Sequence, residues 1–334
     1  MLRFLLHCAT AAVALGPSLA AAEPIKLKLA YFTSDRTSAY VDMVKPFVDA
    51  VNDDAPDGLQ IQVFSSGTLG KAPAQQAQLV LDGIADIAFV IPGATERFAD
   101  NAVVELPGLF EDLREASLVF TNLVAARALE GYDDFVVIGA FATEPESIHT
   151  RATITSLDSL RGMKIRTSSP IEAAALGLLG MQPVLLPASA ISEAISSGSI
   201  DGAAIAPVLL QEFGIGRVAS YHYLLRTSVG SLSLLMNRKK FESLPAQAQD
   251  TIRKYSGLWA AKRFADGYEK LNAQAIELLK ADSRRKVIVP TPAELDRAQV
   301  AFKTVTDEWA SKAPRNRELL ELAQAEIVKL RATR

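Results

Sequence analysis

One stretch of the chain, residues 162–202, alternates short apolar segments that have strand character with small helices. It reads GMKIRTSSPIEAAALGLLGMQPVLLPASAISEAISSGSIDG, in which strand-like residues at 164–167 and 183–186 are each followed by a helical segment, the second of which ends at Gly198. The order strand, helix, strand, helix is typical of a parallel sheet covered by helices. The chain is therefore predicted to have an α/β architecture.

A single arginine stands at the C-terminal end of the first of these strands. Ligands of open α/β sheets bind in the crevice beyond the carboxyl ends of the strands, and Arg166 occupies that position. A guanidinium group held there can bind a carboxylate through two parallel hydrogen bonds. These residues predict a binding site for an organic acid.

The length and composition of the chain indicate a folded protein with two lobes. At 334 residues it is about twice the usual size of one domain, and 49% of its residues are hydrophobic, enough for a substantial core. Its formal net charge of −3 argues against a nucleic-acid-binding surface. We therefore expect two lobes and no nucleic-acid partner.

The first 22 residues have the features of an export signal. Arg3 supplies a basic start, residues 4–15 are apolar, and three alanines that end at Ala22 form a small-residue cleavage site. The prediction is a signal peptide over residues 1–22 that is cleaved near Ala22. The single cysteine, Cys8, lies inside it, so the mature chain is predicted to have no disulfide and no thiolate metal site. We expect neither a cofactor nor a metal.

Periodicity divides the rest of the chain into strands and helices. Alternating or continuous apolar residues predict strands, and apolar residues at helical spacing predict helices. Strands are expected over 26–32, 59–64, 84–91, 135–141 and 232–236, and helices over 40–51, 75–81 and 114–129. The first half is thus a β-α-β-α-β arrangement, and right-handed crossovers place its strands in one parallel sheet.

Two further segments predict how the lobes are joined. Residues 142–150 change to polar turn residues, and we expect the chain to cross between the lobes there. A helix over about 246–281, interrupted at most by Gly257 and Gly267, reaches about 50 Å and is long enough to lie across both lobes. Lobe I is assigned to residues 23–142 plus 229–270, and lobe II to residues 143–228 plus 271–334.

Five motifs, in this order and with this spacing, resemble one family. The chain is similar to the periplasmic solute-binding component of tripartite ATP-independent (TRAP) transporters, of the dicarboxylate-binding (DctP) type, from about Lys26 to about Ile327. The motifs are FSSGTLGKAPAQQAQLVLDGIADIAFV, ELPGLF, SLDSLRGMKIRT, GMQPVLLPASAISEAISSGSIDG and MNRKKFESLP.

The resemblance implies a fold, a function and partners. It implies a type II-like periplasmic binding protein of two α/β lobes, with crossing strands and a long helix that spans both. Such proteins are not enzymes. They close on a small carboxylate, in which the arginine matching Arg166 pairs with the ligand, and deliver it to a small and a large integral membrane subunit driven by an ion gradient. We expect a monomer in the periplasm of a Gram-negative cell.

Departures from the family pattern predict the kind of acid. Ile205 stands where many relatives have an asparagine, and Phe32 and Ile91 stand where the sialic-acid-binding members have asparagine and glutamate. A second ligand arginine of those members falls near Glu144 and Glu146. Apolar walls would leave the hydroxyl groups of a sugar acid without hydrogen bonds, and burying each unpaired hydroxyl is unfavourable by about 1–3 kcal/mol. A monocarboxylate with an aromatic or aliphatic body is therefore expected. If the alignment is displaced by one or two residues, the ligand is instead a sugar acid.

Four more residues complete the predicted ligand-binding set. Phe89, Ser168 and Ala188 fall near the expected cleft, and the role of Arg226 is open between a second anion contact and an ion pair at the hinge. The predicted set is Arg166, Phe32, Phe89, Ile91, Glu144, Glu146, Ser168, Ala188, Ile205 and Arg226.

Besides a solute-binding protein, the sequence allows two other classes to be considered: an exported hydrolase and a sensory protein. An exported hydrolase has little support, because His149 and His222 are the only histidines after the leader and no G-x-S-x-G or H-E-x-x-H motif occurs. Both histidines are expected to be packed or solvated. A sensory protein that presents its bound acid to a membrane receptor has the same lobes, and the sequence does not separate it from a transport protein.

Overall fold

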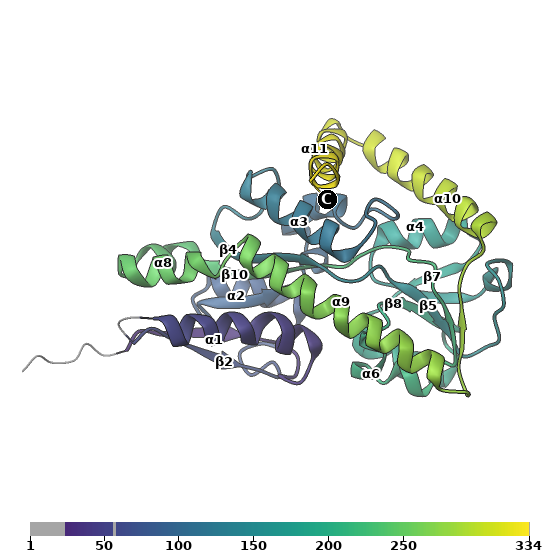
Figure 1. Ribbon diagram of the computed structural model, residues 1–334, viewed down its shortest axis with the longest axis horizontal. Helices are drawn as coiled ribbons and strands as arrows, with labels where there is room; N and C mark the ends of the chain where they lie inside the picture. The colour runs from purple at the N-terminus through teal and green to yellow at the C-terminus, as the bar shows by residue number, and fades with distance from the viewer. Residues whose placement is uncertain (1–23, 56–57, 334) are drawn as a thin grey trace, which may run out of the picture.

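The computed structural model describes residues 24–55 and 58–333, and Figure 1 shows two lobes, each built on one β-sheet. The predicted signal peptide lies outside the described residues. The first sheet has five strands in the order β2-β1-β3-β10-β4. β1 is parallel to β2 and β3, and β10 is antiparallel to both of its neighbours. The strands are β1 (Lys26–Ala30), β2 (Gln60–Phe64), β3 (Ile87–Val90), β4 (Phe135–Ala142) and β10 (Ser231–Asn237).

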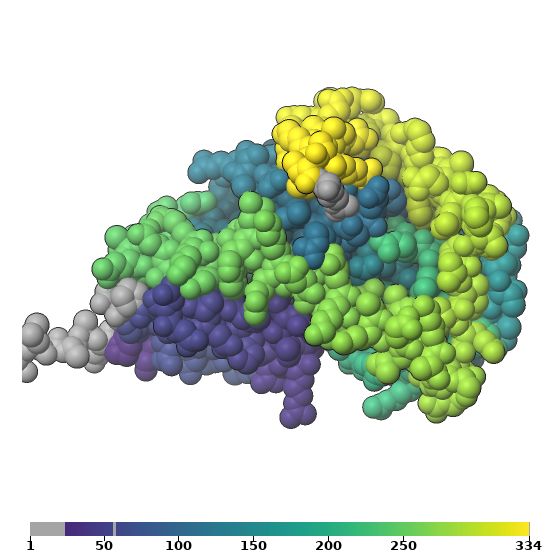
Figure 2. Space-filling view, viewed as in Figure 1, coloured from purple at the N-terminus to yellow at the C-terminus, as the bar shows by residue number. Residues whose placement is uncertain are grey.

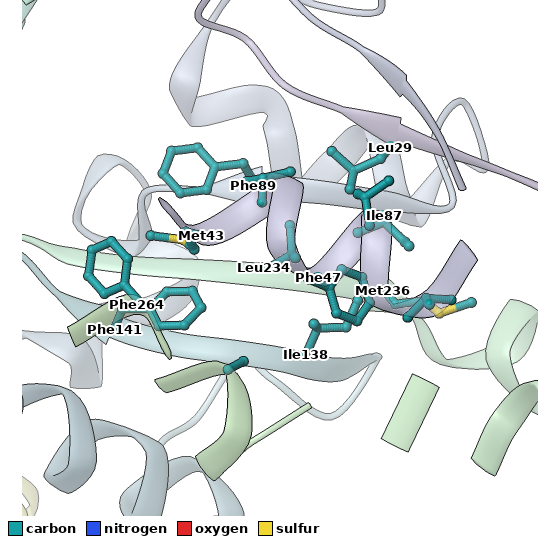
Figure 3. Packing of buried hydrophobic residues seen from close by; sticks show 14 of the residues in the cluster. Leu29, Met43, Phe47, Ile87, Phe89, Ile138, Phe141, Leu234, Met236 and Phe264 are labelled. Carbon is teal, nitrogen blue, oxygen red and sulfur yellow. The ribbon is translucent and has the colours of Figure 1, made fainter. Parts of the chain in front are cut away.

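Helices cover both faces of the first sheet. Phe47, Val48 and Val51 of α1 are buried, which is the helical spacing expected for a face that packs on strands. Figure 3 shows Phe47 lying among core residues of the sheet, including Met236. The helices are η1 (Tyr40–Val44), α1 (Lys45–Asp54), η2 (Pro73–Gln75), α2 (Gln76–Leu81), η3 (Pro92–Ala94), η4 (Glu96–Val103) and α3 (Leu113–Ala125).

The second sheet has six strands in the order β11-β9-β5-β8-β6-β7. β6 is parallel to β7 and β8, as the strand–helix pattern of residues 162–202 predicts. The strands are β5 (Ser147–Thr150), β6 (Lys164–Thr167), β7 (Gln182–Leu185), β8 (Gly202–Ile205), β9 (Tyr221–Tyr223) and β11 (Lys286–Ile288). The helices are η5 (Asp158–Leu160), α4 (Pro170–Leu178), η6 (Ala188–Ala190), α5 (Ile191–Ser197), α6 (Leu209–Glu212) and η7 (Ile215–Arg217).

Two chain segments cross between the sheets side by side. The outbound segment joins β4 to β5, and the return segment joins β9 to β10. The amide of Glu146 donates to the carbonyl of Ser228 at 2.7 Å, and the amide of Thr227 donates to the carbonyl of Glu146 at 2.8 Å. The expectation of turn residues over 142–150 is wrong for its second half, because Ser147–Thr150 forms the fully buried strand β5. Its polar residues hide the strand from a hydrophobicity pattern, although His149 is paired with β9 and β8 and Thr150 donates to the carbonyl of Ala152.

The helix expected over 246–281 is two helices. α8 (Ala246–Lys254) ends before Gly257, which has φ 63° and ψ −125° and starts a new direction for α9 (Leu258–Ala281). α9 has 24 residues, so it is about 36 Å long. It begins against β4 and α3 of the first lobe and ends against β11 of the second, and Figure 2 shows it crossing this face of the molecule. Gly267 does not break α9; an added Cβ would lie 2.9 Å from the Cβ of Asp42.

The last two helices return the chain from the second lobe to the first. α10 (Pro292–Ser311) packs on α4, whereas α11 (Pro314–Arg331) packs on α3 and η4, above the first sheet in Figure 1. Leu319, Ala323 and Ile327 of α11 belong to the same buried cluster as residues of the first sheet. Across residues 24–55 and 58–333, no helix is both long and apolar enough to cross a bilayer.

Candidate ligand-binding site

Arg166 is held by the backbone of the strands on either side of it. It lies in β6 and is 6% exposed. Its Nε donates to the carbonyl of Leu186 at 2.8 Å, just beyond β7, and its Nη1 donates to the carbonyl of Ala204 at 2.9 Å, in β8. These two bonds fix the plane of the guanidinium group. Among the described residues, the Nη2 atom has no hydrogen-bond acceptor, so this edge of the guanidinium group is unpaired.

Glu146 lies beside Arg166, and a second buried glutamate, Glu172, is a neighbour of Glu146. Glu146 is 6% exposed, and its Oε2 is 3.8 Å from the Nη1 atom of Arg166, too far for a hydrogen bond. Glu172 of α4 is fully buried. Its Oε1 accepts from the hydroxyl of Thr227 at 2.5 Å, and its Oε2 accepts from the amide and the hydroxyl of Ser168 at 3.1 and 3.3 Å. Glu146 is thus close to the guanidinium group of Arg166 and is also a neighbour of the carboxyl group of Glu172.

The two glutamates differ in how well their oxygens are satisfied. Glu172 accepts three hydrogen bonds, whereas Oε2 of Glu146 is buried without a partner among the described residues. Burial raises the pKa of Glu146 well above its usual value, the neighbouring Glu172 carboxylate raises it further, and Arg166 opposes both effects. Glu146 was expected where other members of the family have an arginine, and it is instead an acid beside the anchoring arginine.

Phe32 and Phe89 form an aromatic pair on the first lobe, called the aromatic surface below, in which Phe89 is buried and Phe32 is partly buried. Their rings are stacked, with centroids 5.7 Å apart and planes at 25°. Tyr31 packs against Phe89 with centroids 5.2 Å apart. Phe32 follows β1 and Phe89 lies near the end of β3, so the carboxyl ends of adjacent parallel strands bring them together.

A short segment of the second lobe joins the aromatic surface to the arginine. Ala204, whose carbonyl holds Arg166, is followed by Ala206 and Val208, and these two pack in the same cluster as Tyr31 and Phe89. The amide of Val208 also donates to the side chain of Asn272 in α9 at 3.3 Å. The arginine and the aromatic rings are therefore linked through residues 204–208.

The other predicted residues take different positions. Ile91 is partly buried against the cluster that contains Phe89, whereas Ile205 is 2% exposed and packs in a cluster inside the second lobe. Ala188 lies at the edge of that second cluster. Ser168 is exposed at the end of β6 and contacts Glu172. The ligand-binding role of these residues stays a prediction.

Arg226 and Glu144 form an ion pair between the two crossing segments. Nη1 of Arg226 is 3.3 Å from Oε1 of Glu144, and its Nη2 donates to the carbonyl of Glu111 at 2.5 Å. Burial raises the pKa of Glu144, and the charge of Arg226 opposes that rise. Arg226 has φ 61°, an uncommon backbone conformation for a residue with a side chain. Of the two roles left open for Arg226, this geometry favours the ion pair at the hinge.

Sequence reasoning missed three sets of residues at or near the site. Glu172 had a signal, because Ser169-Pro170-Ile171-Glu172 has the spacing of a helix-capping motif and Ser169 does cap α4. The contact between Ser38 and Glu212 and the buried pair of His149 and His222 had none, because 174 and 73 residues separate the partners. Residues 24–55 and 58–333 contain no cluster of three or more side chains suited to a metal ion.

The fold and the site define a class of protein. Two α/β lobes are joined by paired crossing segments and a helix, and a buried arginine with one unpaired edge lies next to Glu146 of a crossing segment. This is the arrangement of a solute-binding protein for organic acids. The model of the family described as "Bacterial extracellular solute-binding protein, family 7" matches residues 29–312, and the chain belongs to that family.

Curated relatives and solved structures agree with this assignment. The 2,3-diketo-L-gulonate-binding periplasmic protein YiaO of Escherichia coli (strain K12) is 23% identical over 309 residues, which cover 88% of this chain and 90% of that protein. A TRAP solute-binding protein of Rhodoferax ferrireducens T118, solved with copurified benzoate, is 25% identical with a TM-score of 0.85, covering 91% of this chain and 98% of that one.

A second solved structure shares the fold. A marine metagenome TRAP solute-binding protein specific for aromatic acid ligands, solved with 3-hydroxybenzoate, is 24% identical with a TM-score of 0.84, covering 92% of this chain and 98% of that one. The protein is therefore the solute-binding component of a TRAP transporter, which captures a carboxylate and delivers it to the membrane subunits.

Proposed function

We propose that the ligand is a small monocarboxylate with an apolar body, and that a benzoate-like aromatic acid fits best. The observation that carries the proposal is Arg166, whose Nε and Nη1 are fixed by backbone carbonyls while Nη2 has no acceptor among the described residues. The stacked rings of Phe32 and Phe89 support an aromatic body. So does the similarity to the R. ferrireducens protein that copurified with benzoate.

Charge and apolar contact area are expected to make separate contributions to ligand binding. A desolvated guanidinium–carboxylate pair supplies the anchor, and an aromatic pair contributes about 0.5–1.5 kcal/mol beyond the area that it buries. A sugar acid would leave several hydroxyl groups against Phe32, Phe89 and Ile91, where each unpaired group is unfavourable by about 1–3 kcal/mol. The same surface therefore attracts one class of acid and rejects the other.

Calorimetric titration tests the ligand class. Benzoate, 3-hydroxybenzoate, hexanoate and galacturonate are compared on the wild-type chain, and we expect the aromatic acids to bind most tightly. Strongest binding of galacturonate would refute the apolar ligand and favour a sugar acid, the class named for the E. coli relative.

Substitution of Arg166 tests the anchor. Arg166→Ala removes one partner of a buried charge pair, at about 2–5 kcal/mol, and is expected to weaken binding about thirtyfold to several thousandfold. Arg166→Lys keeps the positive charge but loses the planar guanidinium group with its several N–H donors, so it controls for the net charge of the site. Unchanged affinity in a folded Arg166→Ala variant would remove the basis of the proposal.

The finer properties of the protein belong to the same proposal. We infer a monomer that is not an enzyme and whose signal peptide is cleaved near Ala22 for release into the periplasm. A bound acid recovered unchanged after long incubation supports a carrier. Genes for two membrane subunits beside this one favour transport, whereas a lone sensor kinase favours the sensory alternative.

The moving units are proposed from the packing. Residues 24–142 with 229–270 form one unit, and residues 143–228 with 271–313 form the other. α11 joins the first unit in this proposal, because it packs on α3 and η4. Energy transfer between dyes on the two units should increase when the ligand closes the cleft.

A further inference from the structure

The acidic side chains around the anchor arginine, Arg166, can carry more negative charge than its single positive charge can neutralise. Glu146 of the outbound crossing segment lies 3.8 Å from it, Glu172 of α4 acts in turn on Glu146, and both glutamates are buried. With both carboxyl groups ionised, the site has a net charge of −1 before any ligand arrives. A ligand carboxylate would add a second negative charge in a place with little water, where like charges are strongly unfavourable.

The groups that face Glu146 come from each element packed around it. Arg166 lies on β6, Ser168 follows β6, and Glu172 lies on α4. The hydroxyl of Tyr268 faces the cluster from α9, where it is buried and feels the charges of Glu144 and Glu146. Burial raises the pKa of Glu105, which lies beyond Glu172 and interacts with it. Arg166 is thus the one cation acting on Glu146 among the described residues.

The hydrogen bonds indicate which glutamate holds a proton. Glu172 accepts from the hydroxyl of Thr227 and from the amide and hydroxyl of Ser168, so both of its oxygens have donors. Glu146 has a buried Oε2 with no donor among the described residues, and it lies 3.8 Å from Arg166 without forming a hydrogen bond. A protonated carboxyl group tolerates that position better than an ionised one.

We propose that Glu146 is a proton-holding residue of the ligand site: it stays protonated beside Arg166, and only in that state can the site accept the carboxylate of the ligand. The proposal rests on the carboxylate site at Arg166. With Glu146 neutral, the positive charge of Arg166 is not neutralised by its neighbour, and the unpaired Nη2 edge can bind an incoming anion. With Glu146 ionised, the uncompensated negative charge repels it. Ligand capture is therefore linked to one proton.

The protonation of Glu146 can be tested without any ligand. Infrared spectroscopy detects the C=O stretch of a protonated carboxyl group, and we expect the wild-type protein to show this band at neutral pH. The band should be weaker in Glu146→Gln than in wild type and unchanged in Glu326→Gln, which changes a partly exposed glutamate on α11. A pH titration of the band in the wild-type protein needs no variant. A spectrum that is identical in wild type and Glu146→Gln overturns the proposal.

The link to binding is tested with benzoate as the probe. Affinity is measured by calorimetry from mildly acidic to alkaline pH, and above the pKa of Glu146 it should fall about tenfold for each pH unit, as expected for one linked proton. Glu146→Gln mimics the neutral acid, so its affinity should match the wild-type value at low pH and stay constant as the pH rises.

Two outcomes of the binding experiment overturn the proposal. Wild-type affinity that does not change with pH shows that no proton is linked. A Glu146→Gln variant that binds benzoate more tightly than wild type at every pH shows that Glu146 is an ionised competitor for Arg166. If benzoate binds at no pH while the infrared band of Glu146 is present, the aromatic ligand of the proposed function fails and the buried protonated acid stands.

Discussion

Ser38 of the first lobe donates both its backbone amide and its hydroxyl to one carboxylate oxygen of Glu212 in the second lobe. The amide nitrogen is 2.6 Å from Oε1, and the hydroxyl also bonds to Oε1. Ser38 follows β1 and Glu212 ends α6, so this contact bridges the two lobes next to the aromatic surface. Burial raises the pKa of Glu212, and the two hydrogen bonds from Ser38 oppose that rise.

The first prediction is that this contact helps to hold the closed form. Ser38→Ala removes the hydroxyl but keeps the backbone bond, and the loss of one hydrogen bond to a carboxylate should weaken ligand binding about threefold to tenfold. The dissociation rate, measured by stopped-flow fluorescence, should account for most of the change. Ser199→Ala, at an exposed position outside the contact, is the matched control. Equal dissociation rates in wild type and Ser38→Ala would show that the contact has no part in closure.

The second prediction separates an aromatic ligand from an aliphatic one. Phe32 is only partly buried, so Phe32→Leu should leave the fold intact while removing the ring that stacks on Phe89. Affinity for benzoate should fall about threefold to tenfold, because an aromatic pair is worth about 0.5–1.5 kcal/mol beyond its area.

Hexanoate provides the internal control for this variant, since it has no ring to stack. Its affinity should be nearly unchanged in Phe32→Leu. A parallel loss for benzoate and hexanoate would indicate that Phe32 contributes only apolar area.

The position of Arg166 could be predicted from the sequence, and its environment could not. The strand–helix pattern of residues 162–202 places it at the end of β6, because that pattern depends on neighbours in the chain. Its partners are the carbonyls of Leu186 and Ala204, 20 and 38 residues away, together with Glu146. Backbone acceptors carry no side-chain signal, so only the folded sheet shows which edge of the guanidinium group is free.

The crossing region shows the same limit. Residues 147–150 contain serine, histidine and threonine, which a hydrophobicity pattern assigns to a turn, yet they form a buried strand. His149 satisfies its ring with His222 and with the carbonyl of Ile205, and both partners are distant in the chain. Likewise, helical periodicity continues through Gly257, and the break there depends on a backbone conformation that composition does not specify.

The third prediction compares two glycines that have open space where a Cβ would lie. Gly257 has φ 63° and ψ −125°, a conformation that only glycine adopts easily, so Gly257→Ala should lower the free energy of unfolding by about 1–3 kcal/mol. Gly177 lies within α4, and Gly177→Ala should raise the free energy of unfolding by about 0.5–1 kcal/mol. Urea denaturation measures both. Equal effects of the two substitutions would show that the break before α9 is unstrained for any residue.

The fourth prediction concerns the buried histidine pair. The Nδ1 atoms of His149 and His222 are 2.8 Å apart, and Nε2 of His149 donates to the carbonyl of Ile205 at 3.1 Å, so the Nδ1 atom of neutral His149 accepts from His222. Desolvation lowers the pKa of His149 to about 3 and that of His222 to about 4; His222 lowers the pKa of His149 further, and the charge of Arg285 lowers that of His222 further. Both rings are therefore neutral in the folded protein at neutral pH.

Folding should accordingly lose stability as the pH falls. Below the usual histidine pKa of about 6.5, the unfolded chain binds two protons that the folded chain does not, so the free energy of unfolding should decrease by about 2 kcal/mol per histidine between neutral pH and about pH 5. The raised pKa values of the buried Glu105, Glu144 and Glu146 act in the opposite direction, because those groups bind protons more readily when folded.

A double variant isolates the histidine contribution from that of the glutamates. His149→Gln/His222→Gln carries no group that titrates in this range at the two positions, while the buried glutamates are the same in both proteins. Urea denaturation at several pH values should show that the wild-type protein loses more stability than the double variant as the solution is acidified, although the variant starts lower because its buried hydrogen bonds are altered. Parallel pH profiles would mean that the histidines titrate alike in the folded and unfolded chains, which their burial and mutual contact do not allow.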